Sequence, residues 1–223
     1  MIEQLPNSPI LVDTLNSFVF QRLKKEALAG IQDIEKSFNL RNNDLLSMFH
    51  QDLPKEIFFK EPKESKDALE KEILRLCEQL INVHPEYLNV LSYFSNYGDD
   101  TNTKTELFVE RFWINYQRPG EFIPLHQHSG VFSFVVWVQI PYLFESKNDS
   151  VNEKYSASKN NKGIFEFVYN DALGAIKKLQ LEADKRWEGK IAVFPANLYH
   201  QVYPFYENEL RISVSGNVRA RLI

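Results

Sequence analysis

The sequence predicts an α+β protein in which a helical N-terminal region, residues 1–100, precedes a β-sandwich or jelly roll over residues 101–223. Three observations support this prediction. Apolar residues recur at helical spacing before residue 100, short aromatic and β-branched runs follow it, and Gly, Pro and Asn turns separate those runs. Of the 223 residues, 43% are hydrophobic and 25% charged, as is typical of a globular chain with one sizeable core.

The N-terminal region is predicted to be helical from three segments. Apolar residues at helical spacing run from Leu11 to Leu23. A second amphipathic segment runs from Lys66 to Val83 and is expected to end near Pro85, because the residue before a proline disfavours helix. The segment Asn43–Gln51 is a candidate for a shorter helix.

Short strands are expected after residue 104. They are Leu107–Tyr116, Val131–Ile140, Ile164–Tyr169, Ile191–Phe194 and Leu210–Val214, with a further strand around His200. The run Val131–Ile140 is long and apolar, as expected for a strand covered on both faces. The polar stretch 145–163 is predicted to be a flexible insertion, either a solvated loop or a substrate lid.

Composition limits the classes of partner. The net charge is −4 and the sequence pI is about 5.8, so no basic balance favours nucleic acid. No apolar run is long enough for a membrane span, and the N-terminus lacks the pattern of a signal peptide, so we expect a cytoplasmic protein without a membrane partner. Cys77 is the only cysteine, so a metal would need nitrogen and oxygen ligands.

Histidines provide the candidate metal ligands. His126 and His128 are two residues apart, and on a strand such residues face the same side. This spacing alone is a weak signal, but His200 lies on a later predicted strand and supplies a third imidazole. The other two histidines, His50 and His84, are expected to be structural.

Arg211 and Ser213 form a candidate carboxylate site. They share one face of a predicted strand, where a guanidinium offers a two-pronged donor and a hydroxyl adds another. Arg211 lies within an otherwise apolar strand, and a buried arginine requires an anionic partner. A metal-binding strand followed by a carboxylate-binding strand suits a keto-diacid cosubstrate, which chelates the metal at one end and binds Arg211 at the other.

Over roughly residues 108–217 the sequence resembles the iron(II)/2-oxoglutarate-dependent oxygenases, in particular their phage and bacterial branch. The resemblance implies a double-stranded β-helix, which is a jelly roll like that of the cupins, with the N-terminal helices packed on it. In that superfamily an H-x-D/E motif, a distal His and an Arg-x-Ser bind iron and 2-oxoglutarate. The matching residues here are His126, His200, Arg211 and Ser213.

The resemblance also nominates residues beside the core motifs. In several branches an Asn four residues before a Pro-Gly turn contacts the head of 2-oxoglutarate, and here that residue is Asn115. Trp137, on the strand after His128, is the best candidate for a residue that contacts the primary substrate.

The sequence departs from the family pattern at His128, where the family has Asp or Glu. His128 can complete a three-His site, or it can face the substrate and leave two His ligands plus water. Alternatively a carboxylate from elsewhere, such as Glu166, completes the site. We rank the three-His site first because residues i and i+2 of a strand share a face. Imidazole ligands must be deprotonated, so iron loading should drop steeply below about pH 6.

The expected function is that of an iron(II)- and 2-oxoglutarate-dependent oxygenase, a hydroxylase of an unidentified substrate, that consumes O2. His126 and His200 would be its catalytic ligands. Two alternatives remain open at this point. One is a cupin-like three-His metalloprotein that does not use 2-oxoglutarate, and the other is a non-catalytic jelly-roll binding protein.

Overall fold

The structure is a computed structural model that describes residues 2–5, 8–31, 55–58, 63–84, 105–144 and 161–222. The expected helix at 43–51 and residues 145–160 of the expected insertion lie outside the described residues. Within the described part of the chain, no helix is both long enough and apolar enough to cross a membrane.

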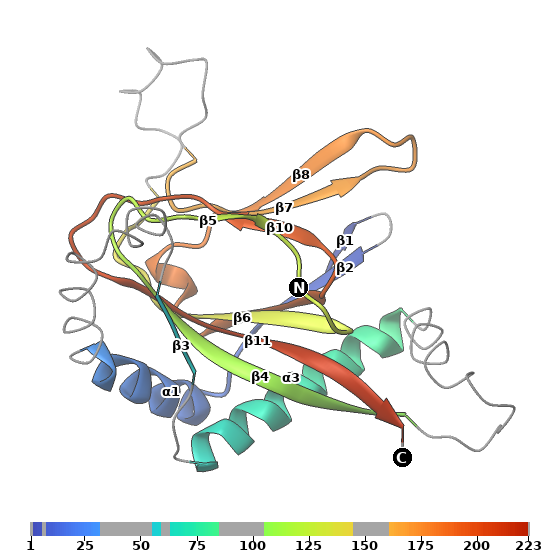
Figure 1. The fold of residues 1–223 in the computed structure, drawn as a ribbon, viewed down its shortest axis with the longest axis horizontal. Helices are drawn as coiled ribbons and strands as arrows, with labels where there is room; N and C mark the ends of the chain where they lie inside the picture. The colour runs from blue at the N-terminus through green and yellow to red at the C-terminus, as the bar shows by residue number, and fades with distance from the viewer. Residues whose placement is uncertain are drawn as a thin grey trace, which may run out of the picture.

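Two antiparallel sheets face each other (Figure 1). The large sheet has the order β1-β2-β9-β6-β11-β4-β3 and the small sheet the order β5-β10-β7-β8. The large sheet consists of β1 (Ile2–Leu5), β2 (Ser8–Thr14), β3 (Lys55–Phe58), β4 (Thr105–Gln117), β6 (Phe132–Gln139), β9 (Lys190–Pro195) and β11 (Arg211–Leu222). The small sheet consists of β5 (Ile123–His126), β7 (Phe165–Asn170), β8 (Ile176–Leu181) and β10 (Tyr199–Val202).

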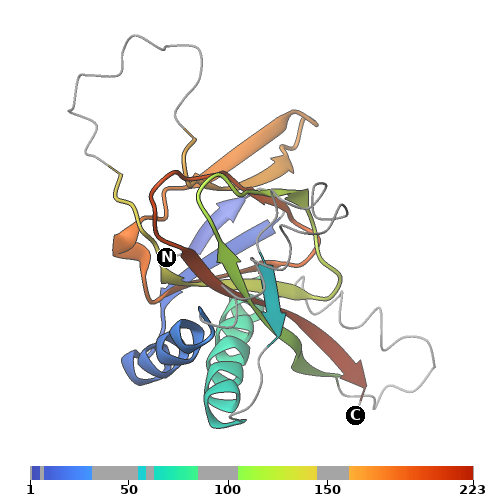
Figure 2. The same ribbon diagram turned by 60° about the vertical axis from the view of Figure 1, so that its left-hand side comes forward.

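Two helices cover the outer face of the large sheet. Helix α1 spans Ser17–Ala29 and helix α3 spans Lys63–Val83, and both lie on the side away from the small sheet (Figures 1 and 2). Their buried apolar side chains form one core with the outer face of the large sheet. A second core fills the space between the sheets. The layers are therefore helices, large sheet and small sheet.

The N-terminal region differs from its predicted helical character. The segment expected to begin a helix at Leu11 continues instead as β2, where Leu11 pairs with Val193 of β9. Helix α1 begins at Ser17. The side chain of the preceding residue, Asn16, caps the helix by accepting a hydrogen bond from the Phe18 N–H. Strands β1, β2 and β3 extend the large sheet at its two edges, because pairing with a distant strand outweighs the local helical spacing.

The predicted double coverage of Val131–Ile140 is confirmed. In β6, Phe134 and Val136 pack in the core shared with the helices, whereas Val135 and Trp137 pack in the core between the sheets. The same alternation holds in β4 and β11. Apart from Trp113, which lines the cavity, their buried apolar residues face the helices, and their inward positions carry polar side chains that line the same cavity. The helical layer thus leaves the inner face of the large sheet free for a polar site.

The packing of α3 predicts a stability effect. Leu76 is 0% exposed, and Leu76→Ala should lower the free energy of unfolding by roughly 2–5 kcal/mol because it leaves a cavity under the sheet. The neighbouring Arg75 side chain is 43% exposed, and Arg75→Ala should change that free energy by about 1 kcal/mol or less. Urea denaturation of both variants checks the difference. Equal effects would mean that α3 does not pack as described.

Candidate metal centre

Three histidines converge at one end of the space between the sheets. His126 is the last residue of β5, His200 lies in β10, and the register of the two strands places these residues directly opposite each other. One ligand nitrogen from each of His126, His128 and His200 lies within 4.8 Å of the others. Such a cluster of imidazoles can hold a transition-metal ion.

His128 reaches this cluster by a different route from the one the sequence suggested. Strand β5 ends at His126, so the two histidines do not share a regular strand. The His128 backbone N–H donates instead to the carbonyl of Ala196, at 2.8 Å, which fixes the segment beside the turn before β10. Its ring centroid lies 4.9 Å from that of His126 and 5.2 Å from that of His200.

Hydrogen bonds orient two of the rings. The Nδ1 atom of His126 lies 2.8 Å from the carbonyl oxygen of Pro124, and the Nδ1 atom of His200 lies 2.9 Å from that of Leu198. A carbonyl oxygen only accepts, so each Nδ1 carries the proton and each Nε2 keeps its lone pair. A backbone carbonyl that accepts a hydrogen bond from Nδ1 in this way commonly orients a metal-ligating histidine.

Burial keeps two of the imidazoles neutral. The pKa of His200 is lowered to about 3 and that of His128 to about 4, mainly by loss of solvation and to a smaller extent by the neighbouring His126. His200 is also stacked on Phe165, with ring centroids 5.5 Å apart and planes 10° apart. Protons should therefore compete with a metal for these two rings only at a pH below the value of about 6 that is expected for an ordinary histidine.

Glu166 does not complete the site in this structure. Its buried carboxylate accepts hydrogen bonds at 2.7 Å from both Gln180 and Gln201 and forms an ion pair at 3.0 Å with Lys178. Gln201 follows His200 on β10, and consecutive strand residues point to opposite faces. Glu166 therefore belongs to the outer face of the small sheet, and the group of potential ligands among the described residues consists of the three histidines.

Arg211 lies deeper between the sheets and is 5% exposed. Its Nε donates to Gln117 Oε1 at 3.0 Å, and its Nη1 donates to Tyr142 Oη at 2.8 Å and to the Gly163 carbonyl at 3.0 Å. Its Nη2 donates to the Tyr203 carbonyl at 3.2 Å. All these acceptors are neutral, and no ion pair of Arg211 with a carboxylate occurs among the residues that the structure describes. A buried cation with neutral partners favours an anionic ligand.

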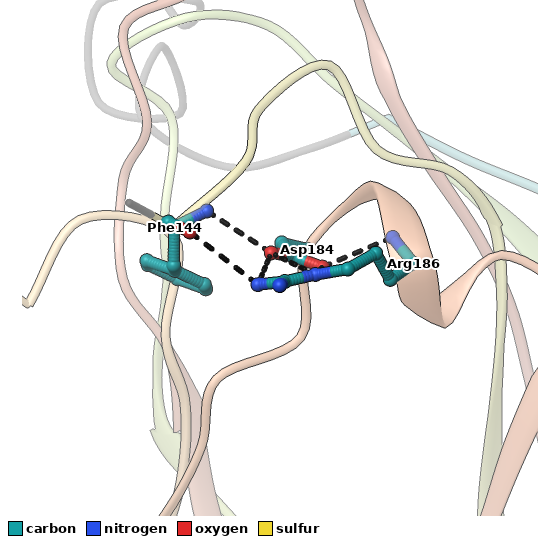
Figure 3. Close-up of polar contacts among 3 residues, drawn as sticks. All are labelled: Phe144, Asp184 and Arg186. Carbon is teal, nitrogen blue, oxygen red and sulfur yellow. Dashed lines mark hydrogen bonds and ion pairs between the residues drawn. The ribbon is translucent and has the colours of Figure 1, made fainter. Parts of the chain in front are cut away.

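The carboxylates nearest to this end already have cationic partners. Asp184 is 0% exposed, accepts the Phe144 N–H at 3.0 Å and pairs with Arg186 (Figure 3). Glu207 pairs with Lys162. Burial is the largest cause that raises the pKa of Tyr142, so this phenol stays protonated and donates to the Gly163 carbonyl at 2.9 Å.

Asn115 carries an unsatisfied polar atom. Its Nδ2 lies 3.3 Å from Ser213 Oγ and 3.2 Å from Ser215 Oγ, while its buried Oδ1 has no hydrogen-bond partner among the described residues. Buried polar atoms are rarely left without a partner in a folded protein. Because an amide can be turned over without changing its shape, this side chain can present either a donor or an acceptor to a ligand.

One cavity of about 50 Å³ brings these groups together. It is lined by seven residues nominated from the sequence, namely Asn115, His126, His128, Trp137, His200, Arg211 and Ser213, but not by Glu166. Sequence reasoning missed Ser215 and Gln117, although Ser215 continues the alternation of Arg211-x-Ser213 and Gln117 pairs with Arg211 in the β-sheet register. It also missed Tyr142, which lies in an irregular segment without a periodic signal.

Comparison with known proteins identifies the segment that carries the cavity. Residues 111–217, just under half of the chain, match the family model described as "Putative 2OG-Fe(II) oxygenase". This segment is similar to the 2OG-Fe(II) oxygenases. The resemblance inferred from His126, His200 and Arg211-x-Ser213 is therefore confirmed, and the family implies iron(II), 2-oxoglutarate and O2 as its cofactor and cosubstrates. Among curated proteins, none matches the chain.

Three solved structures show weaker likeness. An oxidoreductase of the 2OG-Fe(II) oxygenase family from Burkholderia pseudomallei is 19% identical, with a TM-score of 0.37, and the match covers 53% of this chain and 47% of that one. A Pseudomonas putida prolyl-4-hydroxylase is 14% identical, with a TM-score of 0.49 and coverage of 95% and 92%. AviO1 from Streptomyces viridochromogenes Tue57 is 13% identical, with a TM-score of 0.48 and coverage of 95% and 89%.

The low pKa of His200 predicts how the metal-free protein responds to acid. The unfolded chain protonates this residue near its ordinary pKa of 6.5, whereas the folded protein keeps it neutral to about pH 3. Below pH 6.5 the unfolded state thus binds more protons than the folded state. The free energy of unfolding should therefore decrease as the pH is lowered below 6.5, by at most about 1.4 kcal/mol per pH unit for this residue. Denaturation of chelator-treated protein at several pH values should show a shallower slope for His200→Phe than for wild type. Parallel slopes would contradict the burial of a neutral imidazole.

Proposed function

We propose that this protein is an iron(II)- and 2-oxoglutarate-dependent oxygenase that hydroxylates a second, organic substrate. The observation that supports the proposal most directly is the cavity itself. It holds three imidazoles with ligand atoms within 4.8 Å of one another at one end. At the other end it holds a buried guanidinium whose partners are neutral. A keto-diacid fits this arrangement, because its keto acid binds a metal and its far carboxylate binds the arginine.

The topology supports a double-stranded β-helix as the fold of this site. From β4 to β11 the chain passes repeatedly between the sheets, with β4, β6, β9 and β11 in the large sheet and β5, β7, β8 and β10 in the small one. A jelly roll closes on itself in this way. The arrangement places the histidines of the small sheet opposite the polar inner faces of β4 and β11.

His126, His128 and His200 would hold the iron. The tautomers set by Pro124 and Leu198 leave Nε2 of His126 and His200 available as ligands. When bound, the iron supplies the activation of O2 that couples decarboxylation of 2-oxoglutarate to hydroxylation of a C–H bond. The protein positions the reactants and keeps water from them. His200 is stacked on Phe165 and 4% exposed, so its ring is itself shielded from water.

Arg211 would bind the distal carboxylate of 2-oxoglutarate. Gln117 and Tyr142 hold the guanidinium in place before the ligand arrives, which reduces the ordering that binding would otherwise require. The Ser213 hydroxyl lines the same cavity and adds a donor. Asn115 lies opposite Ser213 in the register, and its unsatisfied amide is placed to contact the keto-acid end.

Trp137 is the proposed contact for the primary substrate. It lines the cavity, is 4% exposed and lies opposite Ser213 in the register of β6 and β11. Its ring also packs edge-on against Phe165 and Trp187, with centroids 5.9 and 5.0 Å away. A large fixed aromatic face of this kind provides apolar contact area with little loss of entropy.

Loss of a histidine tests the metal site. Wild-type protein supplied with iron(II), 2-oxoglutarate and O2 should bind about one iron per chain and release succinate. His200→Ala should lose the metal and with it succinate release, because two imidazoles bind iron more weakly than three. The matched control is Gln127→Ala, an exposed residue between two of the ligands, which should keep both. Wild-type protein that binds no iron and forms no succinate would refute the proposal.

Loss of Arg211 separates the two enzymatic alternatives. Arg211→Met should raise the dissociation constant of 2-oxoglutarate on the order of 100-fold, because the distal carboxylate loses its buried charged partner. Iron content should stay unchanged, since Arg211 is not among the potential ligands. The matched control is Arg219→Met on the same strand, where the side chain is 45% exposed. Calorimetric titration measures both. Equal 2-oxoglutarate affinity in wild type and Arg211→Met would favour a three-His metalloprotein that does not use this cosubstrate.

A further inference from the structure

We propose that the cavity binds a second anion together with 2-oxoglutarate, either a carboxylate of the primary substrate or a small inorganic anion. This inference rests on the proposed function, because it assumes a divalent metal at the three histidines and 2-oxoglutarate at Arg211. It names the chemical class that the remaining part of the site should recognise.

The charges that line the cavity are unbalanced. Its lining residues include no Asp or Glu among the described part of the chain, and Arg211 is the one permanently charged residue among them. A ligating imidazole is neutral. A divalent metal held by three imidazoles therefore keeps both of its positive charges, and Arg211 adds a third. The 2-oxoglutarate dianion neutralises two of the three, which leaves one positive charge in a site that is largely shielded from water.

The carboxylates around the cavity do not supply the missing charge. Asp184 is committed to Arg186, and Glu207 to Lys162. Glu166 faces the other side of the small sheet, where it pairs with Lys178. Each of these pairs is locally neutral, so their net field at the cavity is weak. An isolated buried charge is costly, so an anion that enters the cavity should bind there in preference to a neutral molecule of the same shape.

His128 is the residue that creates this imbalance. An aspartate at this position would bring the sum of charges to zero, whereas the histidine leaves it at one positive charge. Trp113 lies beside His128, with ring centroids 5.6 Å apart, and both line the cavity. The Asn115 amide and the hydroxyls of Ser213 and Ser215 also line the cavity and can donate hydrogen bonds, which suits an anion more than a cation.

The size of the cavity limits the anion. The same cavity must also hold 2-oxoglutarate, so the space left beside that ligand suits a single small group rather than a second diacid. A carboxylate at the end of an organic substrate and a free halide or formate both meet this description. Both are compact monoanions, and the titrations described next distinguish a substrate carboxylate from a free inorganic anion.

Spectroscopic titration tests the inference without activity. The protein is loaded with cobalt(II), which stays divalent in air and whose visible absorption responds to ligand changes, and is saturated with 2-oxoglutarate. Formate is then titrated against its neutral isostere formamide. Saturable changes with formate and none with formamide are expected. Chloride is the second arm. Binding of both anions would indicate a free inorganic anion, and binding of formate alone would indicate the carboxylate of an organic substrate.

Two isosteric variants isolate the charge at position 128. His128→Asp adds one negative charge and His128→Asn adds none, while their side chains have nearly the same shape. Formate should bind His128→Asn with an affinity close to that of wild type. It should bind His128→Asp about tenfold more weakly or worse, because the added charge repels it in a poorly solvated site. Thermal melting checks that both variants fold. The comparison of formate with formamide uses wild-type protein and does not depend on either variant.

Failure of the inference differs from failure of the proposed function. If cobalt and 2-oxoglutarate do not bind, the proposed function is overturned. If both bind but formate gives no saturable change, or formate and formamide bind alike, the second anion site is overturned alone. Equal formate affinity in the Asp and Asn variants would likewise overturn it, since the charge at position 128 would then not govern binding.

Discussion

The large sheet is covered on both faces, and this coverage determines what the two sides of β4, β6 and β11 can carry. Helices α1 and α3 bury one set of alternate residues, including Tyr116, Val136 and Ile212. That core provides the hydrophobic stabilisation of the sheet. The other set faces the small sheet and is free to include polar and charged side chains. The functional cavity therefore depends on a helical layer that does not touch it.

Arg211 is a charged side chain that lies buried on the face of the large sheet opposite the helices. Removing a guanidinium from water costs several kcal/mol, and neutral acceptors such as Gln117 Oε1 and Tyr142 Oη offset part of that cost. An anionic ligand at Arg211, as proposed above, would compensate the rest. Gln117 is itself held by its Nε2, which donates to the Glu121 carbonyl. Arg211 is thus rigidly oriented before any ligand arrives, and a rigid site loses less entropy on binding.

Much of the site could be predicted from the sequence because strands have a period of two. That period relates Arg211 to Ser213. The long apolar run Val131–Ile140 in turn correctly predicted a strand with two buried faces. Prediction failed where tertiary pairing decided the outcome. Leu11 fits a helical spacing, yet it pairs with β9. Strand β8 was not expected either, since Ile176–Leu181 alternates weakly and pairs along one side with β7.

His128 illustrates a limit of the period-two argument that has a chemical consequence. The strand ends at His126, so a hydrogen bond from the His128 N–H to the Ala196 carbonyl, and not strand periodicity, brings this ring to the cluster. A backbone hydrogen bond can hold the main chain of any residue other than proline at this position. The placement of the main chain is therefore independent of the charge of the third side chain. A carboxylate and an imidazole can exchange here without disturbing β5 or β10, and the exchange alters the charge that the remaining ligands must balance.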